Sequence, residues 1–497
     1  MSQPTRAEWE ARARALKIEG RAFIQGEYLA AASGETFDCI SPVDGRLLAK
    51  VASCDDADAE RAVQSARSTF DSGVWSREAP ATRKAVMIRF AALLEEHAEE
   101  LALLETLDMG KPIGDSLNVD LPGAADSLRW SGEAIDKVYD EVAATSHDQL
   151  GLVTREPVGV VAAIVPWNFP LMMAAWKLGP ALATGNSVIL KPSERSPLTA
   201  IRIAQLAIEA GIPAGVLNVL PGYGHTVGKA LALHMDVDTA VFTGSTRIAK
   251  QLMVYAGESN MKRVWLEAGG KSPNIVFEDA PDLQAAAESA AAAIAFNQGE
   301  VCTAGSRLLV QKSIKAKFLP LVVEALKGWK AGHPLDPETN VGALVDGRQL
   351  EQVLGYIQAG QDEGAKILTG GKRVLEETGG TYVEPTLFDG VSNAMKIARE
   401  EIFGPVLSVI EFEDAEEAIR IANDTPYGLA AAVWTRDISK AHLTARALRA
   451  GSVWVNMYDG GDMTAPFGGF KQSGNGRDKS LHAFDKYTEL KATWIKL

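Results

Sequence analysis

The chain alternates continuous apolar runs with stretches whose apolar residues follow helical spacing. A first series of apolar runs, rich in β-branched residues, occupies 158–165, 186–193, 215–222 and 239–245. Runs of this kind are typical of strands buried on both faces of a sheet. Between two of them, residues 196–211 have the spacing of an amphipathic helix that ends at Gly211. This alternation predicts a doubly wound parallel sheet.

A second series begins after residue 267, with apolar runs at 272–278, 306–311, 406–412, 429–435 and 451–456. The alanine-rich stretch 283–298 predicts a buried helix, and the region up to Asp136 predicts mainly helices that wrap the first sheet. Two strand-like pieces, 146–157 and 487–497, fit neither series, and we expect them to pair with another subunit.

The predicted fold class is therefore α/β, with two doubly wound parallel-sheet domains and a small oligomerisation β-segment. The boundaries that we expect are 1–136 with 158–266 for the first domain, 267–478 for the second, and 137–157 with 479–497 for the oligomerisation segment.

Composition excludes several classes of function. The 497 residues carry a net charge of −14 and no basic run, so neither nucleic acid nor a membrane surface is an expected partner. The N-terminus lacks the apolar core of a secretory signal, and no apolar run is long enough to span a bilayer. The three cysteines have no metal-ligand spacing and form no disulfide framework, so we expect a cytoplasmic protein without a metal.

Polar motifs follow the strands of the first series at 166–170, 191–194, 221–228 and 242–246. Ligands of open parallel sheets lie at the carboxyl ends of the strands. Lys191 and Glu194 are either a ribose clamp or a solvated salt bridge. Gly244 and Ser245 open either a phosphate-binding helix or a plain turn. The glycine-rich dinucleotide fingerprint G-x-G-x-x-G is absent.

Cys302 lies in "FNQGEVCTAG" (296–305), a polar turn flanked by glycines. A structural cysteine usually has apolar neighbours, so this setting favours a reactive thiol about as much as an inert buried one. No histidine is close in sequence. Glu267, in "LEAGGKSPN", is a candidate base if it is buried, and otherwise a surface turn residue.

The stretches "WLEAGGKSPN" (265–274) and "FNQGEVCTAGSR" (296–307) resemble the two active-site signatures of the aldehyde dehydrogenase superfamily. Further motifs resemble the family in the same order: "PWNFP", "KPSE", "FTGST", "EEIFGPV", "NDTPYGLAAAVWT" and "PFGGFKQSGNGR". The resemblance covers the chain from about residue 20 to its C-terminus. It implies an NAD-dependent enzyme, with weaker use of NADP, whose first domain is Rossmann-like and binds NAD and whose second domain is catalytic.

The resemblance also implies roles for individual residues. Cys302 is expected to attack the aldehyde, and the thiohemiacetal becomes a thioester after hydride transfer to NAD. The side-chain amide of Asn168 and the backbone N–H of Cys302 would form the oxyanion hole. Glu267 would activate the hydrolytic water. Lys177 and Asp478 fall where the family often has a Lys–Glu proton relay, and the aspartate puts that relay in doubt.

The expected NAD contacts are Ile164, Pro166, Trp167, Lys191, Ser193, Glu194, Gly224, Phe242, Gly244, Ser245, Ile248, Leu266, Glu401 and Phe403. The expected substrate contacts are Phe169, Met173, Trp176, Val301, Thr303, Asp459, Asp462 and Phe467. No metal ligand is expected.

The substrate funnel of the family corresponds to 456–470, which here contains "DGGD" where an aromatic residue is common. Asp459 and Asp462 either hold a cationic or hydrogen-bonding aldehyde tail or cap a turn. The stretches "NMKRVWLEAGGKS" and "DGGDMTAPFGGFKQSGNGRDKSLHAFDKYTELK" resemble the bacterial polyamine-catabolism branch, which includes γ-glutamyl-γ-aminobutyraldehyde and 4-guanidinobutyraldehyde dehydrogenases. We therefore expect oxidation of an ω-amino, ω-guanidino or γ-glutamylamino butyraldehyde to its acid.

Other functions stay open. They are a general aliphatic or betaine-type aldehyde dehydrogenase, a CoA-acylating semialdehyde dehydrogenase and, with less support, a crystallin-like structural protein or a zinc alcohol dehydrogenase. A small-molecule aldehyde is the expected partner, and the chain is expected to form a homotetramer or homodimer.

Overall fold

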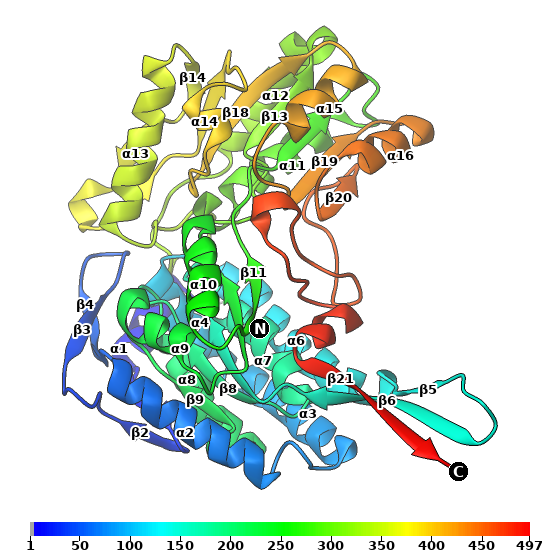
Figure 1. Cartoon of the computed structure of the whole chain (residues 1–497). Coiled ribbons are helices and arrows are strands. Elements are labelled where there is room, and N and C mark those ends of the chain that lie inside the picture. Colours follow the sequence, from blue (N-terminus) through cyan, green and yellow to red (C-terminus); the bar gives the residue numbers. More distant parts are fainter. Residues whose placement is uncertain (1–3) are drawn as a thin grey trace.

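The computed structural model describes residues 4–497 and contains two seven-stranded sheets, one in the lower half and one in the upper half of Figure 1. The first sheet has the order β11-β10-β7-β8-β9-β1-β2. Its strands are β1 (Ala22–Ile24), β2 (Glu27–Leu29), β7 (Val160–Ile164), β8 (Ser187–Lys191), β9 (Leu217–Val219), β10 (Thr239–Thr243) and β11 (Arg263–Glu267). The last five run parallel, and every residue of β7 and β8 is buried, as their apolar composition predicts.

The second sheet has the order β14-β17-β18-β13-β12-β19-β20. Its strands are β12 (Pro273–Val276), β13 (Arg307–Gln311), β14 (Lys366–Thr369), β17 (Thr386–Asp389), β18 (Val406–Phe412), β19 (Ala430–Trp434) and β20 (Ser452–Val455). All of them except β14 pair in parallel. The predicted α/β class with two parallel-sheet halves is confirmed.

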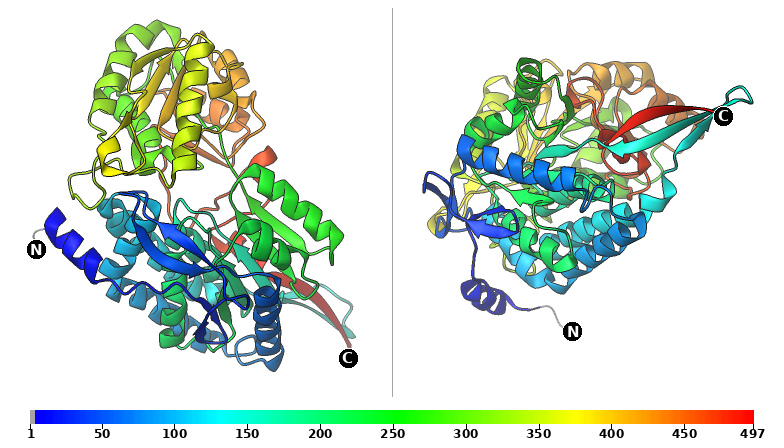
Figure 2. Two further views of the ribbon diagram at one scale, coloured as in Figure 1. Left: turned by 90° about the vertical axis from the view of Figure 1, so that its left-hand side faces the viewer. Right: turned by 60° about the horizontal axis from the view of Figure 1, so that its bottom comes forward.

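Helices flank both sheets (Figure 2). In the first half they are α1 (Arg6–Ala15), α2 (Asp56–Ser72), α3 (Pro80–Glu96), α4 (Ala98–Met109), α5 (Ile113–Asp115), α6 (Leu121–Ala134), α7 (Pro170–Ala183), α8 (Leu198–Ala210), α9 (Lys229–Leu233) and α10 (Thr246–Glu258). In the second half they are α11 (Leu283–Ala295), α12 (Lys312–Lys327), α13 (Gly347–Asp362), α14 (Lys396–Arg399), α15 (Ala415–Asn423) and α16 (Ile438–Ala447). Within residues 4–497, none of these helices has both the length and the hydropathy to cross a membrane.

The N-terminal region differs from the expected run of helices. It also contributes β1 and β2 to the edge of the first sheet and forms the hairpin of β3 (Thr36–Ile40) and β4 (Leu47–Ala52). Strands this short contain too few residues to establish an alternating apolar pattern, so the surrounding helical pattern dominates the sequence signal.

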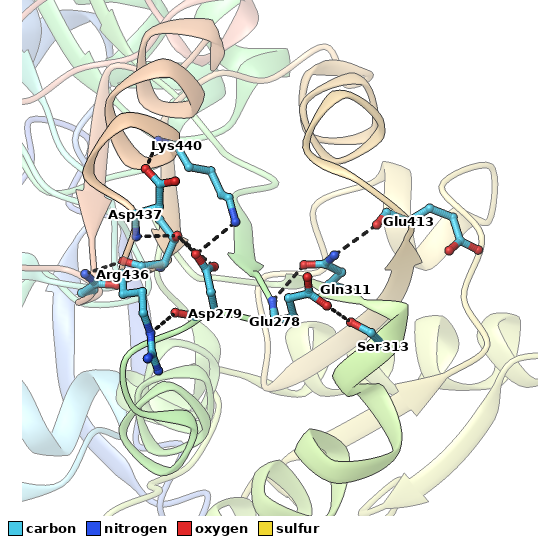
Figure 3. A network of polar contacts seen from close by, with 10 residues as sticks. Glu278, Asp279, Gln311, Ser313, Glu413, Arg436, Asp437 and Lys440 are labelled. Atoms are coloured by element: carbon cyan, nitrogen blue, oxygen red, sulfur yellow. Dashed lines mark hydrogen bonds and ion pairs between the residues drawn. The ribbon is translucent and has the colours of Figure 1, made fainter.

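The carboxyl ends of four strands in the second sheet are joined by a polar network (Figure 3). Thr435, just after β19, donates its hydroxyl hydrogen to Asp279, which follows β12 and also pairs with Lys440 at 3.1 Å. Gln311, at the end of β13, accepts from the Glu278 N–H at 2.8 Å and donates to a carbonyl oxygen after β18. The polar groups at the carboxyl ends of these strands thus form hydrogen bonds with one another. The segments before β12 and β13, at the opposite ends of the strands, lead toward the first sheet.

The two strand-like pieces that fitted neither series pair with each other. β21 (Thr488–Lys496) runs antiparallel to β6 (Gln149–Pro157), and β5 (Glu141–Ala143) completes a three-stranded sheet. This sheet extends beyond the body of the molecule (Figures 1 and 2). β21 forms its edge, and Leu490 and Trp494 on one face of that strand are more than half exposed. An exposed apolar edge strand is a surface on which a further strand pairs readily.

We predict that this sheet holds copies of the chain together. Replacing Leu490 and Trp494 with glutamate should reduce the assembled mass measured by light scattering to that of a smaller species, because both charges would be buried in the interface. Lys491→Gln, on the opposite face of β21, is the matched control and should keep the assembled mass. An unchanged mass for the glutamate variant would contradict the assignment.

Candidate active site

The loop that carries Cys302 is held in an unusual backbone conformation. Asn297, Gln298 and Gly299 follow α11 with φ values of 49°, 57° and 70°. A Cβ atom on Gly299 would lie 2.4 Å from the carbonyl group of Gly404, so this close approach requires glycine. The left-handed run turns the chain sharply and places Cys302 half-buried between the two halves of the molecule.

Asn168 meets this loop from the first half. It lies between β7 and α7, is buried, and donates a side-chain N–H to the Glu300 carbonyl oxygen at 2.8 Å. Asn297 donates to the Asn168 carbonyl oxygen at 3.1 Å and fixes the same segment. One N–H of the Asn168 amide is therefore occupied, and the other finds no acceptor within residues 4–497. The amide is thus held beside the cysteine loop, and its second N–H remains available to donate a hydrogen bond.

Glu267 is the last residue of β11 and is buried. Neither of its carboxyl oxygens has a hydrogen-bond partner among the described residues. Burial, and next the negative charge of Asp478, raise the pKa of this carboxyl well above its usual value. The expectation that Glu267 is a candidate base required burial, and the structure provides it.

Lys177 and Asp478 form a buried ion pair with an Nζ–Oδ2 distance of 2.5 Å. Lys177 lies on α7, and Asp478 lies in the polar segment between Phe467 and η7 (Leu481–Lys486). Lys486 makes a second buried ion pair with the other oxygen of Asp478. Asp478 is thus held between two lysines, and the lysine charges outweigh burial to hold its pKa below the usual value.

The electrostatic setting of the thiol is acidic. Burial raises the pKa of Cys302, and the carboxylates of Glu401, Asp459 and Glu267 raise it further. Glu401 accepts the Gly270 N–H at 3.0 Å, and burial raises its own pKa to about 7. No basic side chain within the described part of the chain is among the causes of the thiol shift. The free protein therefore holds this sulfur mainly as the thiol at neutral pH.

Most of the residues expected to contact NAD lie at or after the carboxyl ends of β7 to β11 in the first sheet, and Glu401 and Phe403 come from the second half. The buried Lys191 pairs with the half-buried Glu194 at 3.4 Å. Ser245 caps α10 by accepting the Ile248 N–H, while Gly244 has no room for a Cβ because the Phe242 ring is 2.5 Å away. Ile164 and Leu266 lie in the apolar cluster of Phe242. The predicted contacts Pro166 and Ser193 follow β7 and β8, and Gly224 begins the helical turn after β9.

These residues fit a dinucleotide. The first-turn N–H groups of α10 suit a pyrophosphate, Lys191 and Glu194 suit a ribose diol, and open space surrounds Gly224. Trp167 of the first half and Phe403 of the second pack edge to face with their ring centroids 5.1 Å apart, and Phe403 is two residues after Glu401. The two halves of the molecule are thus in contact among the residues expected to bind NAD.

A cavity of about 170 Å³ opens against the cysteine loop, with Val301 and Thr303 in its wall and Cys302 between them outside the lining. Of the expected substrate contacts, Val301, Thr303 and Asp459 line it. Its other walls include Phe296, Trp329 and Tyr458, none of which stood out in the sequence. Tyr458 donates its hydroxyl hydrogen to the Thr303 carbonyl oxygen at 2.6 Å, which ties the 456–463 loop to the cysteine loop.

The other expected substrate contacts lie around this cavity rather than in its wall. Trp176 and Phe467 pack against each other with centroids 5.1 Å apart, and the Phe169 ring stacks on Phe296. Met173 is buried on α7 beside them. Asp462 is exposed and accepts the Thr464 N–H at 2.8 Å, which is the turn-capping alternative.

Three buried ionisable residues of the site were missed in the sequence. Lys486 is one. Glu300 accepts the Val345 N–H at 3.1 Å, and burial raises its pKa well above the usual value. Lys271 lies near Glu401, and burial lowers its pKa to about 7. Long polar side chains near glycines indicate loops, so nothing in the local pattern marks these three as buried.

Comparison with known proteins places the chain among enzymes. A family model described as the aldehyde dehydrogenase family matches residues 28–493. The NADP/NAD-dependent aldehyde dehydrogenase PuuC of Escherichia coli is 58% identical over 99% of this chain and 98% of its own length. A solved indole-3-acetaldehyde dehydrogenase with NAD+ is 84% identical, covers 100% of both chains and has a TM-score of 0.99. A γ-glutamyl-γ-aminobutyraldehyde dehydrogenase structure from Burkholderia cenocepacia is 64% identical over 99% and 100% of the two chains, with a TM-score of 0.98.

The acidic setting of Cys302 predicts its reactivity. At pH 8, iodoacetamide should alkylate Cys302 roughly two to five times faster in the Asp459→Asn variant than in the unchanged protein. The reason is that removing a nearby negative charge lowers the pKa of the thiol. Peptide mass spectrometry over time gives the rate, and the buried Cys39 and Cys54 should stay unlabelled. Asp462→Asn is the matched control. Equal rates for the two variants would contradict the prediction.

Proposed function

The chain belongs to the aldehyde dehydrogenase family, and on that premise we propose that it oxidises an ω-amino, ω-guanidino or γ-glutamylamino butyraldehyde to its carboxylic acid with NAD. NAD-dependent aldehyde oxidation follows from the family. The identity of the aldehyde is the proposal. It is supported by the 64% identical γ-glutamyl-γ-aminobutyraldehyde dehydrogenase and, within this chain, by the carboxylate of Asp459.

Asp459 is the observation that carries the substrate assignment. It lines the cavity beside Cys302 with a φ of 57°, a left-handed conformation that a non-glycine residue adopts at a cost in free energy. Asp459 is exposed to solvent, and the protein atoms that approach its carboxyl raise the pKa of that group. The carboxylate is therefore accessible from the cavity and could make a charge-assisted hydrogen bond with a cationic aldehyde tail.

The mouth of the site also holds a positive charge. Lys479 lies over the Trp176 ring, with Nζ 5.1 Å from the centroid, and its charge lowers the pKa of Asp459. A γ-glutamylamino tail carries both an ammonium and a carboxylate and could match both signs. An ω-amino or ω-guanidino tail would match Asp459 alone.

In the proposed mechanism Cys302 gives its proton to solvent and its thiolate attacks the aldehyde carbon, which gives a thiohemiacetal. The free N–H of Asn168 and the backbone N–H of Cys302 would receive the developing alkoxide. The anchored amide needs no reorganisation when that charge appears, which is the source of such rate enhancements. NAD, when bound, accepts the hydride, and the acyl group is left on the sulfur as a thioester.

Glu267 would then take a proton from the water that attacks the thioester. Its raised pKa makes it a stronger base once it is ionised. Both of its oxygens are free of protein donors within residues 4–497, so either can accept the water proton. Hydrolysis releases the acid and restores the thiol.

This role distinguishes hydrolysis from acyl transfer to CoA. Glu267→Gln should keep a first-turnover burst of NADH but lower the steady-state rate by about 10²–10⁴-fold, because general base catalysis is lost after the thioester has formed. Stopped-flow absorbance measures both phases. Product analysis should find the free acid with and without CoA. A CoA thioester, or an unchanged steady state in the variant, would favour the acylating alternative.

An aromatic aldehyde is the second candidate substrate. The 84% identical indole-3-acetaldehyde dehydrogenase supports it, as do the aromatic walls of the cavity, Phe296, Trp329 and Tyr458. An indole side chain would pack on these rings without using the carboxylate of Asp459. The two candidates therefore differ in their dependence on that residue.

A comparison of four aldehydes tests the assignment: 4-guanidinobutyraldehyde, γ-glutamyl-γ-aminobutyraldehyde, hexanal and indole-3-acetaldehyde. Asp459→Asn should lower kcat/KM for the two charged substrates by about tenfold, since a hydrogen bond to a charged group is lost, and should leave the two uncharged ones within about twofold. Asp462→Asn serves as the control. Higher efficiency with indole-3-acetaldehyde, unaffected by Asp459→Asn, would instead select the aromatic candidate.

A further inference from the structure

Lys486 is a fully buried cation at the back of the active site. It ends η7, is 3% exposed, and pairs with one oxygen of Asp478, while Lys177 pairs with the other oxygen. The Tyr487 ring lies 5.5 Å from its ammonium group. Lys486 has no carboxylate other than Asp478 within ion-pair distance in residues 4–497.

The charges of this cluster do not balance without Glu267. Asp478 carries one negative charge and faces two buried lysines, so one positive charge remains. Glu267 and Lys486 flank the same glycine: a Cβ atom on Gly476 would lie 3.5 Å from Glu267 Oε1 and 3.6 Å from Lys486 Cδ. The buried carboxyl of Glu267 also interacts electrostatically with Asp478, Lys177 and Lys486. Burying an unbalanced charge costs free energy, so the second lysine favours the ionised form of Glu267. With Glu267 ionised, the four buried groups sum to zero.

Other groups face the cluster as well. Arg477 also favours the ionised form of Glu267, but it is half-buried and donates to the carbonyl oxygens of Gly469 and Gly476, at 3.1 and 2.6 Å. Cys302 interacts with Glu267 from the second half of the molecule, and the buried hydroxyl of Tyr487 faces Asp478. Within residues 4–497, Lys486 and Lys177 each have Asp478 as their one ion-pair partner, and the two lysines share it.

We propose that Lys486 is a positioning residue whose buried ammonium group supplies a second positive charge that stabilises the ionised form of Glu267, the form that acts as the base, while Lys177 stays paired with Asp478. The inference rests on the proposed role of Glu267. It gives Asp478 a function of its own. The short carboxylate holds both lysines in place but balances only one of their charges, and the remaining positive charge stabilises the carboxylate form of Glu267.

Three variants test the charge balance through the acidic limb of the kcat–pH profile, measured with saturating NAD and aldehyde. Lys486→Met removes a positive charge, raises the pKa of Glu267 and should move the limb to higher pH by about one unit. Asp478→Asn removes a negative charge and should move it to lower pH by a similar amount. The double variant removes one charge of each sign, and its limb should return to within about half a unit of the unchanged enzyme.

The size of the NADH burst should stay unchanged in all three, because thioester formation precedes the step that uses Glu267. Lys491→Gln, which alters an exposed ion pair on β21, should leave both readouts unchanged. Circular dichroism checks folding. If Lys486→Met alone does not fold, Asp478→Asn and the double variant still test the inference, because the acidic limb of Asp478→Asn must lie at lower pH than that of the double variant.

A limb that is unmoved in folded Lys486→Met, or that moves the same way in Lys486→Met and Asp478→Asn, would overturn the inference. Failure of the proposed function looks different: the unchanged enzyme would form no NADH with any aldehyde, or Glu267→Gln would keep full steady-state turnover.

Discussion

The active site depends on one constraint. The thiol of Cys302 and the carboxyl of Glu267 must lie close together in a poorly solvated space, although they belong to the two different halves of the molecule. Glu267 ends the last strand of the first sheet, and Cys302 precedes a strand of the second. Neither half contains a complete site. Asn168 joins them through a hydrogen bond to the backbone of the cysteine loop, so the position of the nucleophile is set by a residue of the other half.

Burial has opposite effects on the groups of this site. It raises the pKa of Cys302 and of Glu267, so both favour their neutral forms in the free protein, while the lysines around Asp478 keep that carboxyl ionised. Loss of the thiol proton makes a negative charge appear in a poorly solvated space, and so does the ionisation of Glu267 that must precede its proton uptake. The positions of nearby charges therefore matter more here than they would on the surface.

Much of this arrangement could be predicted from the sequence. Strands buried on both faces leave long apolar runs, so β7, β8, β13 and β18 lie where such runs occur. Cys302 stood out because its neighbours are polar. The short N-terminal strands left no such pattern. Lys486 could not be recognised, because its burial depends on Asp478 and on Lys177, which is far away in sequence. The walls of the cavity were missed for the same reason: Trp329 and Phe296 meet Tyr458 only in the folded chain.

The junction between η7 and β21 has a mechanical consequence. A single residue, Tyr487, separates Lys486 from the exposed strand. Tyr487 is fully buried, and its carbonyl oxygen accepts hydrogen bonds from the Val158 N–H at 3.1 Å and from the side chain of Asn186 at 3.0 Å. These two hydrogen bonds fix the backbone of Tyr487 to the first sheet. A force applied to the protruding β21 is therefore resisted at Tyr487 before it can displace Lys486 and the buried ion pairs of the active site.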